Sequence, residues 1–304
     1  MSHPLGRPAR PAIRNDASDA PREKPPAPGS PRGSRLADIM PRILSSLVLA
    51  TAAITAVWWG GEVFSIIWLG AAYAVGYEWQ TLIRAARPLL RLILVALALV
   101  LAAEFARRGS FSAASAAVAI LGLATALAAG SSRRYWAFVG VVYAGALIIS
   151  VNALNNSAAF GPKAIFWLFA AVWGTDVFAY FGGRLVGGPK LLPKISPSKT
   201  WSGTLIGVFS GALLGVVAAK LLGFSIGGRG LGDFSSVLAM FGLGLVTALV
   251  SQAGDVFESV VKRWFGVKDS SLLIPGHGGF MDRLDGFLAA ATFMALAGAA
   301  LRLM

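Results

Sequence analysis

The sequence contains no cysteine and only two histidines among its 304 residues. Without cysteine the chain forms no disulfide, holds no thiolate-ligated metal and offers no thiol nucleophile. It also lacks the P-loop pattern, the Gly-x-Ser-x-Gly elbow and the His-Glu-x-x-His zinc motif. Serine hydrolase and zinc protease functions therefore have no support in the sequence.

Charge is also scarce, and most of it is positive. Charged residues make up 13% of the chain against 56% hydrophobic residues, and Lys plus Arg outnumber Asp plus Glu by 27 to 14. A basic chain often binds nucleic acid. Here the positive charges lie in the N-terminal tail and between apolar blocks, so membrane topology and anionic lipid explain them better. We expect membrane lipids as partners and no nucleic acid.

Apolar blocks of about 17–20 residues, long enough to cross a bilayer core as helices, recur along the chain. We predict nine of them, near 43–60, 63–79, 89–105, 112–130, 135–151, 164–183, 203–222, 236–254 and 286–303. The fold class expected is therefore all-α, a polytopic integral membrane protein with about nine transmembrane helices. Glycines at 207, 211 and 215 form a small-residue stripe that predicts close helix packing, within one protomer or between two.

Residues 1–40 are rich in Pro, Arg, Ser and Gly, which predicts a disordered basic tail. The excess of Lys and Arg in alternate connections puts this tail in the cytoplasm and the C-terminus outside. The same count puts the charged connections 184–202 and 255–285 on the cytoplasmic face, where nucleotides and Mg²⁺ are available. We divide the rest of the chain into N-terminal transmembrane helices, 41–160, and a catalytic transmembrane region, 161–304.

Residues 255–285 hold five of the fourteen carboxylates and one of the two histidines. Charge inside an apolar protein costs free energy unless it is paired, metal-bound or hydrated. On a helix, Asp255, Glu258, Ser259 and Lys262 share one face. A solvated face with a Glu258–Lys262 ion pair accounts for part of this pattern, but not for Asp255, which directly follows an apolar run.

Asp282 and Asp285 open the last apolar block and also share a helix face. Capping of the helix N-terminus accounts for one of them. Two of them together with Asp255 make a cluster of like charges that is unfavourable without a cation, and carboxylate oxygens suit Mg²⁺. We therefore predict Asp255, Asp282 and Asp285 as metal ligands.

Candidate phosphate-binding groups surround these carboxylates. Glycines 278 and 279 allow backbone N–H groups to face an anion, and His277 is equally well a phosphate donor or a turn residue. Lys199 and Thr200 precede a helix, where they suit phosphate binding or simply a snorkelling Lys and an N-cap. Asp176 lies inside an apolar block and is a functional candidate, whereas Glu78 and Glu104 lie near block ends, so we expect them at the membrane interface.

The C-terminal half carries an extended motif. It reads Ser259-x-Val261-Lys262-Arg263, then Lys268-Asp269-x-Ser271, then Ile274-Pro275-x-His277-Gly278-Gly279-Phe280-x-Asp282-Arg283-Leu284-Asp285. This motif resembles the signature of the phosphatidate cytidylyltransferases, and every fixed position is filled. Ser196-Pro197-x-Lys199-Thr200 and Asp176-x-x-Ala179-Tyr180-x-x-Gly183 resemble two further blocks of that family. Ser202 departs from the Glu or Gln that family members often carry.

The resemblance implies transfer of CMP from CTP to phosphatidate, giving CDP-diacylglycerol and pyrophosphate. It also implies Mg²⁺, a second, monovalent cation such as K⁺, a homodimer, a bacterial inner membrane, and a polar cavity open to the cytoplasm and laterally to lipid. The catalytic residues it implies are the carboxylates Asp255, Asp282 and Asp285 and the basic residues Lys199, Lys262, Arg263 and Arg283, which would neutralise phosphate charge. The substrate-binding residues are Ser196, Ser198, Lys199, Thr200, Lys268, His277, Gly278, Gly279, Asp176 and Tyr180.

Two other functions are consistent with parts of the sequence. A secondary transporter would have many spans and a buried Asp176, but no inverted repeat is visible and the carboxylates gather at one face of the membrane. A membrane scaffold without chemistry would tolerate neutral substitutions in its charged loops.

Overall fold

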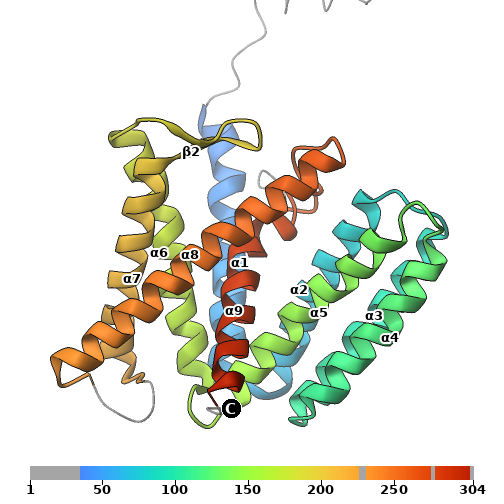
Figure 1. Cartoon of the computed structure of the whole chain (residues 1–304), viewed down its shortest axis with the longest axis horizontal. Helices are drawn as coiled ribbons and strands as arrows, with labels where there is room; N and C mark the ends of the chain where they lie inside the picture. The colour runs from blue at the N-terminus through green and yellow to red at the C-terminus, as the bar shows by residue number, and fades with distance from the viewer. Residues whose placement is uncertain (1–34, 226–230, 275–277, 302–304) are drawn as a thin grey trace, which may run out of the picture.

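The computed structural model describes residues 35–225, 231–274 and 278–301, with side chains from residue 44 onward (Figure 1). His277 therefore lies outside the described residues. Within them the chain forms nine α-helices and one short β-hairpin. The elements are α1 (Arg35–Trp59), α2 (Gly61–Leu82), α3 (Pro88–Arg107), α4 (Phe111–Ala128), α5 (Arg134–Asn156), α6 (Gly161–Leu185), β1 (Lys190–Leu192), β2 (Ser196–Thr200), α7 (Trp201–Leu222), α8 (Phe234–Trp264) and α9 (Met281–Ala300).

Each predicted apolar block falls on one of these helices, but α1 begins eight residues before its block, inside the segment 1–40 predicted as a tail, and α8 ends ten residues after its block. Seven described helices, α3 to α9, are long and apolar enough to cross a membrane. In α1 the apolar part with described side chains, Leu44–Trp59, is shorter. The prediction of an all-α polytopic membrane protein is thus confirmed, with the small β-hairpin as an addition that the sequence did not indicate.

The hairpin lies in the connection 184–202, which the sequence predicted as a charged connection. Strands β1 and β2 pair antiparallel, with Lys190 opposite Thr200 and Leu192 opposite Ser196. Thr200 then caps α7, because its Oγ1 accepts a hydrogen bond from Gly203 N at 3.1 Å. The hairpin thereby fixes Lys199 directly before the first turn of α7.

Helices α6 and α7 pack closely because the glycine stripe of α7 faces α6. A Cβ on Gly207 would lie 2.6 Å from Ala179 Cβ and from the Thr175 carbonyl oxygen. A Cβ on Gly211 would overlap the Thr175 side chain, and one on Gly215 would contact Trp167. The stripe therefore serves packing within the protomer, one of the two possibilities left by the sequence.

Arg91 closes the α2–α3 connection from inside the protein. Its guanidinium is buried and donates to the carbonyl oxygens of Gln80 at 2.9 Å, Ala85 at 2.9 Å and Ala86 at 2.8 Å. These bonds satisfy one carbonyl group in the last turn of α2, that of Gln80, and two in the connection that follows it. The C-terminal end of α2, which carries Glu78, is therefore firmly held.

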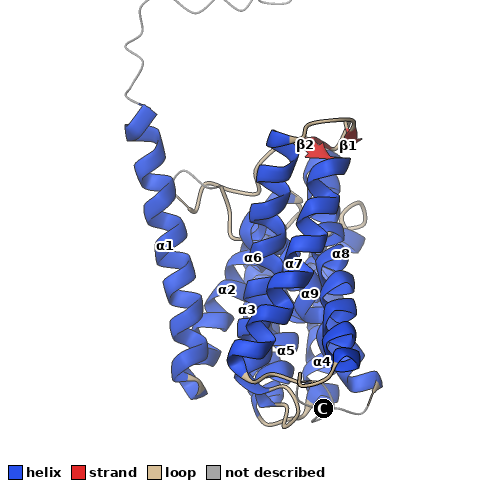
Figure 2. Cartoon of the chain, turned by 90° about the vertical axis from the view of Figure 1, so that its left-hand side faces the viewer, coloured by secondary structure: helices blue, strands red, loops and turns tan. Residues whose placement is uncertain are grey.

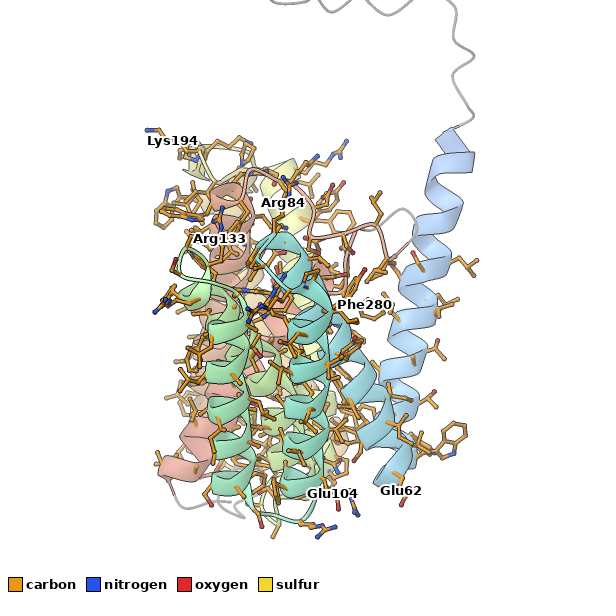
Figure 3. The ribbon with its side chains drawn as sticks, turned by 90° about the vertical axis from the view of Figure 1, so that its right-hand side faces the viewer. Glu62, Arg84, Glu104, Arg133, Lys194 and Phe280 are labelled. Atoms are coloured by element: carbon orange, nitrogen blue, oxygen red, sulfur yellow. The ribbon has the colours of Figure 1, made fainter. Side chains whose placement is uncertain are left out.

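The helices form a bundle with α3 and α4 on one flank and the α6–α7 pair on the other (Figure 1). Helix α1 stands at the side of the bundle (Figure 2) and packs against α2 and α6. Arg84, Arg133 and Lys194 lie at the hairpin end of the bundle, and Glu62 and Glu104 lie at the other end (Figure 3). Glu104 is exposed and pairs with Arg107 and Arg108.

Candidate active site

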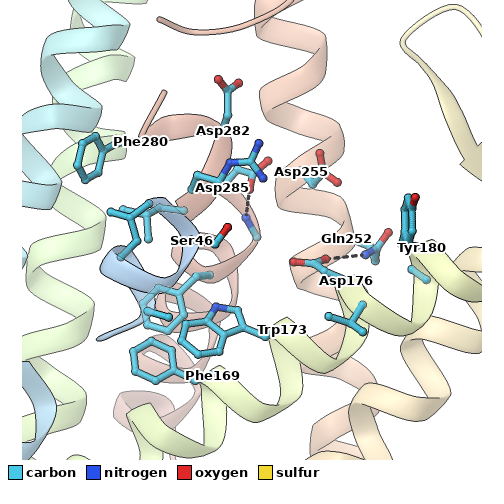
Figure 4. Close-up of a pocket in the computed structure, with 18 of the residues that line it drawn as sticks. Ser46, Phe169, Trp173, Asp176, Tyr180, Gln252, Asp255, Phe280, Asp282 and Asp285 are labelled. Carbon is cyan, nitrogen blue, oxygen red and sulfur yellow. Dashed lines mark hydrogen bonds between the residues drawn. The ribbon is translucent and has the colours of Figure 1, made fainter. Parts of the chain in front are cut away.

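A cavity of about 1230 Å³ opens between α1, α2, the hairpin and helices α6 to α9 (Figure 4). Its lining divides into two parts of different chemistry. The apolar part includes Leu49, Ala53, Ile67, Trp68, Phe169, Trp173 and Phe287. The polar part includes Asp176, Tyr180, Arg184, Lys190, Ser198, Lys199, Thr200, Gln252, Asp255, Asp282, Arg283 and Asp285.

Lys199 connects the hairpin to α8 at the polar end of this cavity. Its Nζ lies 2.5 Å from Asp255 Oδ2 and donates to Gln252 Oε1 at 3.0 Å. Gln252 Nε2 in turn donates to Asp176 Oδ1 on α6 at 3.3 Å (Figure 4). The predicted residues Asp176, Lys199 and Asp255, far apart in sequence, are thus brought together.

Three carboxylates lie close enough to share one cation. One oxygen from each of Asp255, Glu258 and Asp285 lies within 4.8 Å of the other two. Asp255 and Glu258 stand one turn apart on α8, and Asp285 comes from α9, so the group joins two helices.

The approach of α8 to α9 depends on two glycines. A Cβ on Gly254 would lie 2.7 Å from the Asp285 carbonyl oxygen and 2.6 Å from Ala289 Cβ. A Cβ on Gly286 would lie 2.6 Å from Ser251 Oγ. Glycine at both positions lets the backbones come close enough for carboxylates of the two helices to meet.

Asp282, predicted as the third metal ligand, lies outside this three-carboxylate group, and Glu258 takes its place. Asp282 Oδ1 lies 2.5 Å from Lys262 Nζ, and its Oδ2 accepts from Ser270 N at 3.1 Å and Gly279 N at 2.8 Å. Both oxygens of Asp282 are therefore already bound by donors of the protein. The predicted i,i+4 ion pair of Glu258 with Lys262 is confirmed, at 2.5 Å.

Lys262 consequently bridges two carboxylates. It does not line the cavity as a group that neutralises phosphate charge would. Arg263 is exposed and donates to the carbonyl oxygens of Ile195 at 3.2 Å and Val267 at 3.0 Å. Lys268 is also exposed, and neither it nor Ser196 is among the residues that line the cavity. Arg184 and Lys190 do line it, although the sequence indicated for them only a role in topology.

The glycine pair at 278 and 279 contacts carboxylates of the protein. Gly278 has a φ of 84°, and a Cβ there would lie 2.7 Å from Asp282 Oδ2. The N–H of Gly279 is already used by Asp282. These glycines therefore permit close approach of Asp282 to the backbone, in place of the phosphate cradle that we expected.

Glu78 is another residue near the site whose contacts the sequence did not indicate. The sequence placed it at the membrane interface, and in the structure it is fully buried on α2. Its carboxylate accepts from Ser271 Oγ at 2.6 Å and from the backbone N–H groups of Phe280 at 2.8 Å and Met281 at 2.7 Å. The available signal was a carboxylate in an apolar block, which is a functional candidate by default.

Comparison with known proteins agrees with this arrangement. Residues 40–301 match the cytidylyltransferase family. A protein of Brucella abortus named phosphatidate cytidylyltransferase is 37% identical over 271 residues, which cover 87% of this chain and 94% of that protein. A protein of the same name from Haemophilus influenzae is 31% identical over 280 residues, which cover 83% of this chain and 96% of that protein. This chain is therefore a member of the cytidylyltransferase family.

Proposed function

We propose that this protein is a phosphatidate cytidylyltransferase, which transfers CMP from CTP to phosphatidate and releases pyrophosphate. The observation that carries the proposal is the division of the cavity into an apolar and a polar part. One substrate is a lipid with two acyl chains and an anionic headgroup, and the other is a water-soluble triphosphate. A cavity that offers aromatic and aliphatic walls beside cations and carboxylates suits the meeting of two such molecules. Relatives named for this activity, which match this chain over 94% and 96% of their own length, support the same conclusion.

The reaction needs positioning and charge neutralisation more than covalent help. An oxygen of the phosphatidate phosphate attacks the α-phosphorus of CTP, and the bond from that phosphorus to the oxygen bridging to the β-phosphorus breaks. Pyrophosphate leaves with the electron pair of that bond. Since the attacking phosphate is already ionised at neutral pH, no strong general base is required. The main task of the protein is to bring two anions together.

The carboxylate group fits a magnesium ion. Asp255 pairs with Lys199 and Glu258 with Lys262, but three carboxylate oxygens within 4.8 Å of one another still favour a further cation between them. Ser251 Oγ, one helical turn before Asp255, is buried and has no hydrogen-bond partner among the described residues. Asp255, Glu258 and Asp285 would hold Mg²⁺, which when bound neutralises charge on the reacting phosphates. A second, monovalent cation such as K⁺ remains part of the proposal, without assigned residues.

Four basic side chains along the cavity would bind phosphate oxygens. They are Arg184, Lys190, Lys199 and Arg283, from α6, β1, β2 and α9. Lys199 would shift from Asp255 toward a phosphate oxygen when substrate and cation are present. Ser198, Thr200 and Tyr180 line the same part of the cavity and would donate hydrogen bonds.

The charge distribution supports a cytoplasmic site in a bacterial inner membrane. Arg84, Arg133 and Lys194 lie at the end of the bundle that carries the hairpin (Figure 3), and positive charge favours the cytoplasmic side. If α1 and α2 also cross the membrane, nine spans leave the N-terminus and residues 1–40 in the cytoplasm and the C-terminus outside.

Two further parts of the proposal concern organisation. We keep the division into N-terminal helices, 41–160, and a catalytic region, 161–304, but α1 and α2 of the N-terminal part also contribute to the site because they line the cavity. We further propose a homodimer, whose interface excludes the glycine stripe of α7 because that stripe packs against α6. Native mass spectrometry of the protein released from detergent would distinguish a dimer from a monomer.

The direct test is pyrophosphate release by purified protein in detergent. We expect release that requires phosphatidate, CTP and Mg²⁺ together, with CDP-diacylglycerol detected by mass spectrometry. Replacing CTP by ATP is the matched control. Release that is independent of phosphatidate, or equal with ATP, would refute the proposed function.

A further inference from the structure

We infer that Glu78 on α2 is a positioning residue, which holds the N-terminus of α9 and thereby sets the place of the carboxylates that act on the substrates. The inference rests on the proposed function. Glu78 does not line the cavity, so it acts through other residues.

The contacts of Glu78 converge on a single junction. One carboxylate oxygen accepts from Ser271 Oγ at 2.6 Å and Phe280 N at 2.8 Å, and the other from Ser270 Oγ at 3.0 Å and Met281 N at 2.7 Å. Phe280 is the N-cap residue of α9 and Met281 its first residue. A negative charge is favourable there because the first N–H groups of a helix have no partner within it and the helix dipole is positive at this end.

The junction is built to admit this carboxylate. A Cβ on Gly279 would lie 2.5 and 2.6 Å from the two oxygens of Glu78, so only glycine leaves room for the carboxylate. The Ser270 hydroxyl lies 3.0 Å from both Glu78 Oε2 and Asp282 Oδ2 and shares its one proton between them, and the Ser270 N–H donates to Asp282 Oδ2 at 3.1 Å. Glu78 is thus linked to Asp282 through one serine.

The first turn of α9 carries the groups that matter for the site. Asp282, Arg283 and Asp285 all line the cavity and all follow Met281 within four residues. A shift of this turn would move Asp285 relative to Asp255 and Glu258 on α8. Groups that orient metal ligands from outside the ligand set typically change metal affinity or activity by about 10–100-fold when they are removed.

The test compares Glu78→Gln with Glu62→Gln, which makes the same change in the same helix at an exposed position. For Glu78→Gln we expect kcat to fall about 10–100-fold and the Mg²⁺ concentration for half-maximal rate to rise about tenfold, with a smaller change in the KM for CTP. Glu62→Gln should behave as the wild type. Hydrogen exchange at the Phe280 and Met281 amides should accelerate in Glu78→Gln but not in Glu62→Gln.

Two readouts separate positioning from a merely structural role. If Glu78→Gln lowers only the thermal midpoint, and kcat and the Mg²⁺ half-saturation stay within about twofold of the wild type, the inference is wrong. Should Glu78→Gln fail to fold, Ser271→Ala removes a single donor and should shift the Mg²⁺ half-saturation in the same direction. An unchanged half-saturation in Ser271→Ala would then overturn the inference.

The inference and the proposed function fail in different ways. Mn²⁺ binding followed by electron paramagnetic resonance, together with amide exchange, reads the Glu78 junction without any turnover. Wild-type protein that binds Mn²⁺ more tightly than Glu78→Gln but releases no pyrophosphate would support the junction and refute the cytidylyltransferase reaction.

Discussion

Lys262 offers the sharpest test of how the carboxylates are held. Its Nζ lies 2.5 Å from Glu258 Oε2 and 2.5 Å from Asp282 Oδ1, and the exposed fractions of the three side chains are 12%, 0% and 7%. Replacing Lys262 by Met leaves two buried carboxylates without their shared cation. Removing one partner of a buried ion pair typically destabilises a protein by about 3–5 kcal/mol.

The expected consequence is a large loss of stability. At about 2–4 °C per kcal/mol, the midpoint of thermal unfolding should fall by about 6–20 °C, measured in detergent by tryptophan fluorescence. Lys220→Met, at an exposed position near the end of α7, is the control and should change the midpoint little. The double variant Glu258→Gln, Lys262→Met should regain much of the stability but no activity, since one proposed cation ligand is then missing.

The outcome also distinguishes two roles for Lys262. The sequence predicted a group that neutralises substrate phosphate, whereas the geometry indicates a residue that holds two carboxylates. If Lys262→Met unfolds within about 2 °C of the wild type and only the KM for CTP rises, the phosphate role is right and the present reasoning is refuted.

Three further predictions concern the cavity and its walls. Asp255→Asn should lower turnover about 100-fold or more, because it removes one of the three carboxylates proposed to hold Mg²⁺. Exposed Asp269→Asn is the control, and turnover near the wild-type value in Asp255→Asn would contradict the metal assignment. Gly254→Ala should separate α8 from α9 and reduce turnover about tenfold or more. Gly242→Ala in the same helix, where a Cβ meets nothing within 4 Å, should leave turnover unchanged, and equal rates in both variants would contradict the close approach of the two helices as a requirement. Ala53→Trp should fill part of the apolar end of the cavity and raise the KM for phosphatidate but not the KM for CTP. Leu47→Trp, at an exposed position of α1, should change neither KM, and an equal rise of both KM values in Ala53→Trp would place the lipid outside the apolar end.

The helices could be predicted from the sequence because the signal is local. Each apolar block is long enough to form one helix whatever its neighbours do, so each block falls on one of the observed helices. The meeting of Asp255 with Asp285 was also predictable. Both carboxylates lie in the charged segment 255–285, which charge asymmetry assigned to one face of the membrane, although Asp255 itself lies inside α8, which continues to Trp264.

The choice between Glu258 and Asp282 was not accessible from sequence. Both carboxylates lie within reach of Lys262, and both share a helix face with another carboxylate of the cluster. Which of them joins the cation group depends on the Ser270 and Gly279 donors that engage Asp282, and these come from the irregular segment before α9. Spacing along one helix carries no information about such contacts.

Glu78 was missed for a similar reason. Its partners lie about 200 residues away in sequence, from Ser270 to Met281. A single carboxylate near the end of an apolar block is equally consistent with an interfacial position and with a buried contact. Only the packing of α2 beside the start of α9 distinguishes the two.

The proposed divalent-cation site consists of Asp255, Glu258 and Asp285, beside the polar end of the cavity. Its most direct test is anomalous diffraction from crystals of the full chain soaked with Mn²⁺, which prefers the same oxygen ligands as Mg²⁺. We expect one strong anomalous peak bounded by these three carboxylates, and we expect it to be lost in crystals of Asp285→Asn. A peak held by Asp282 without Glu258, or no peak near α8 and α9, would contradict it.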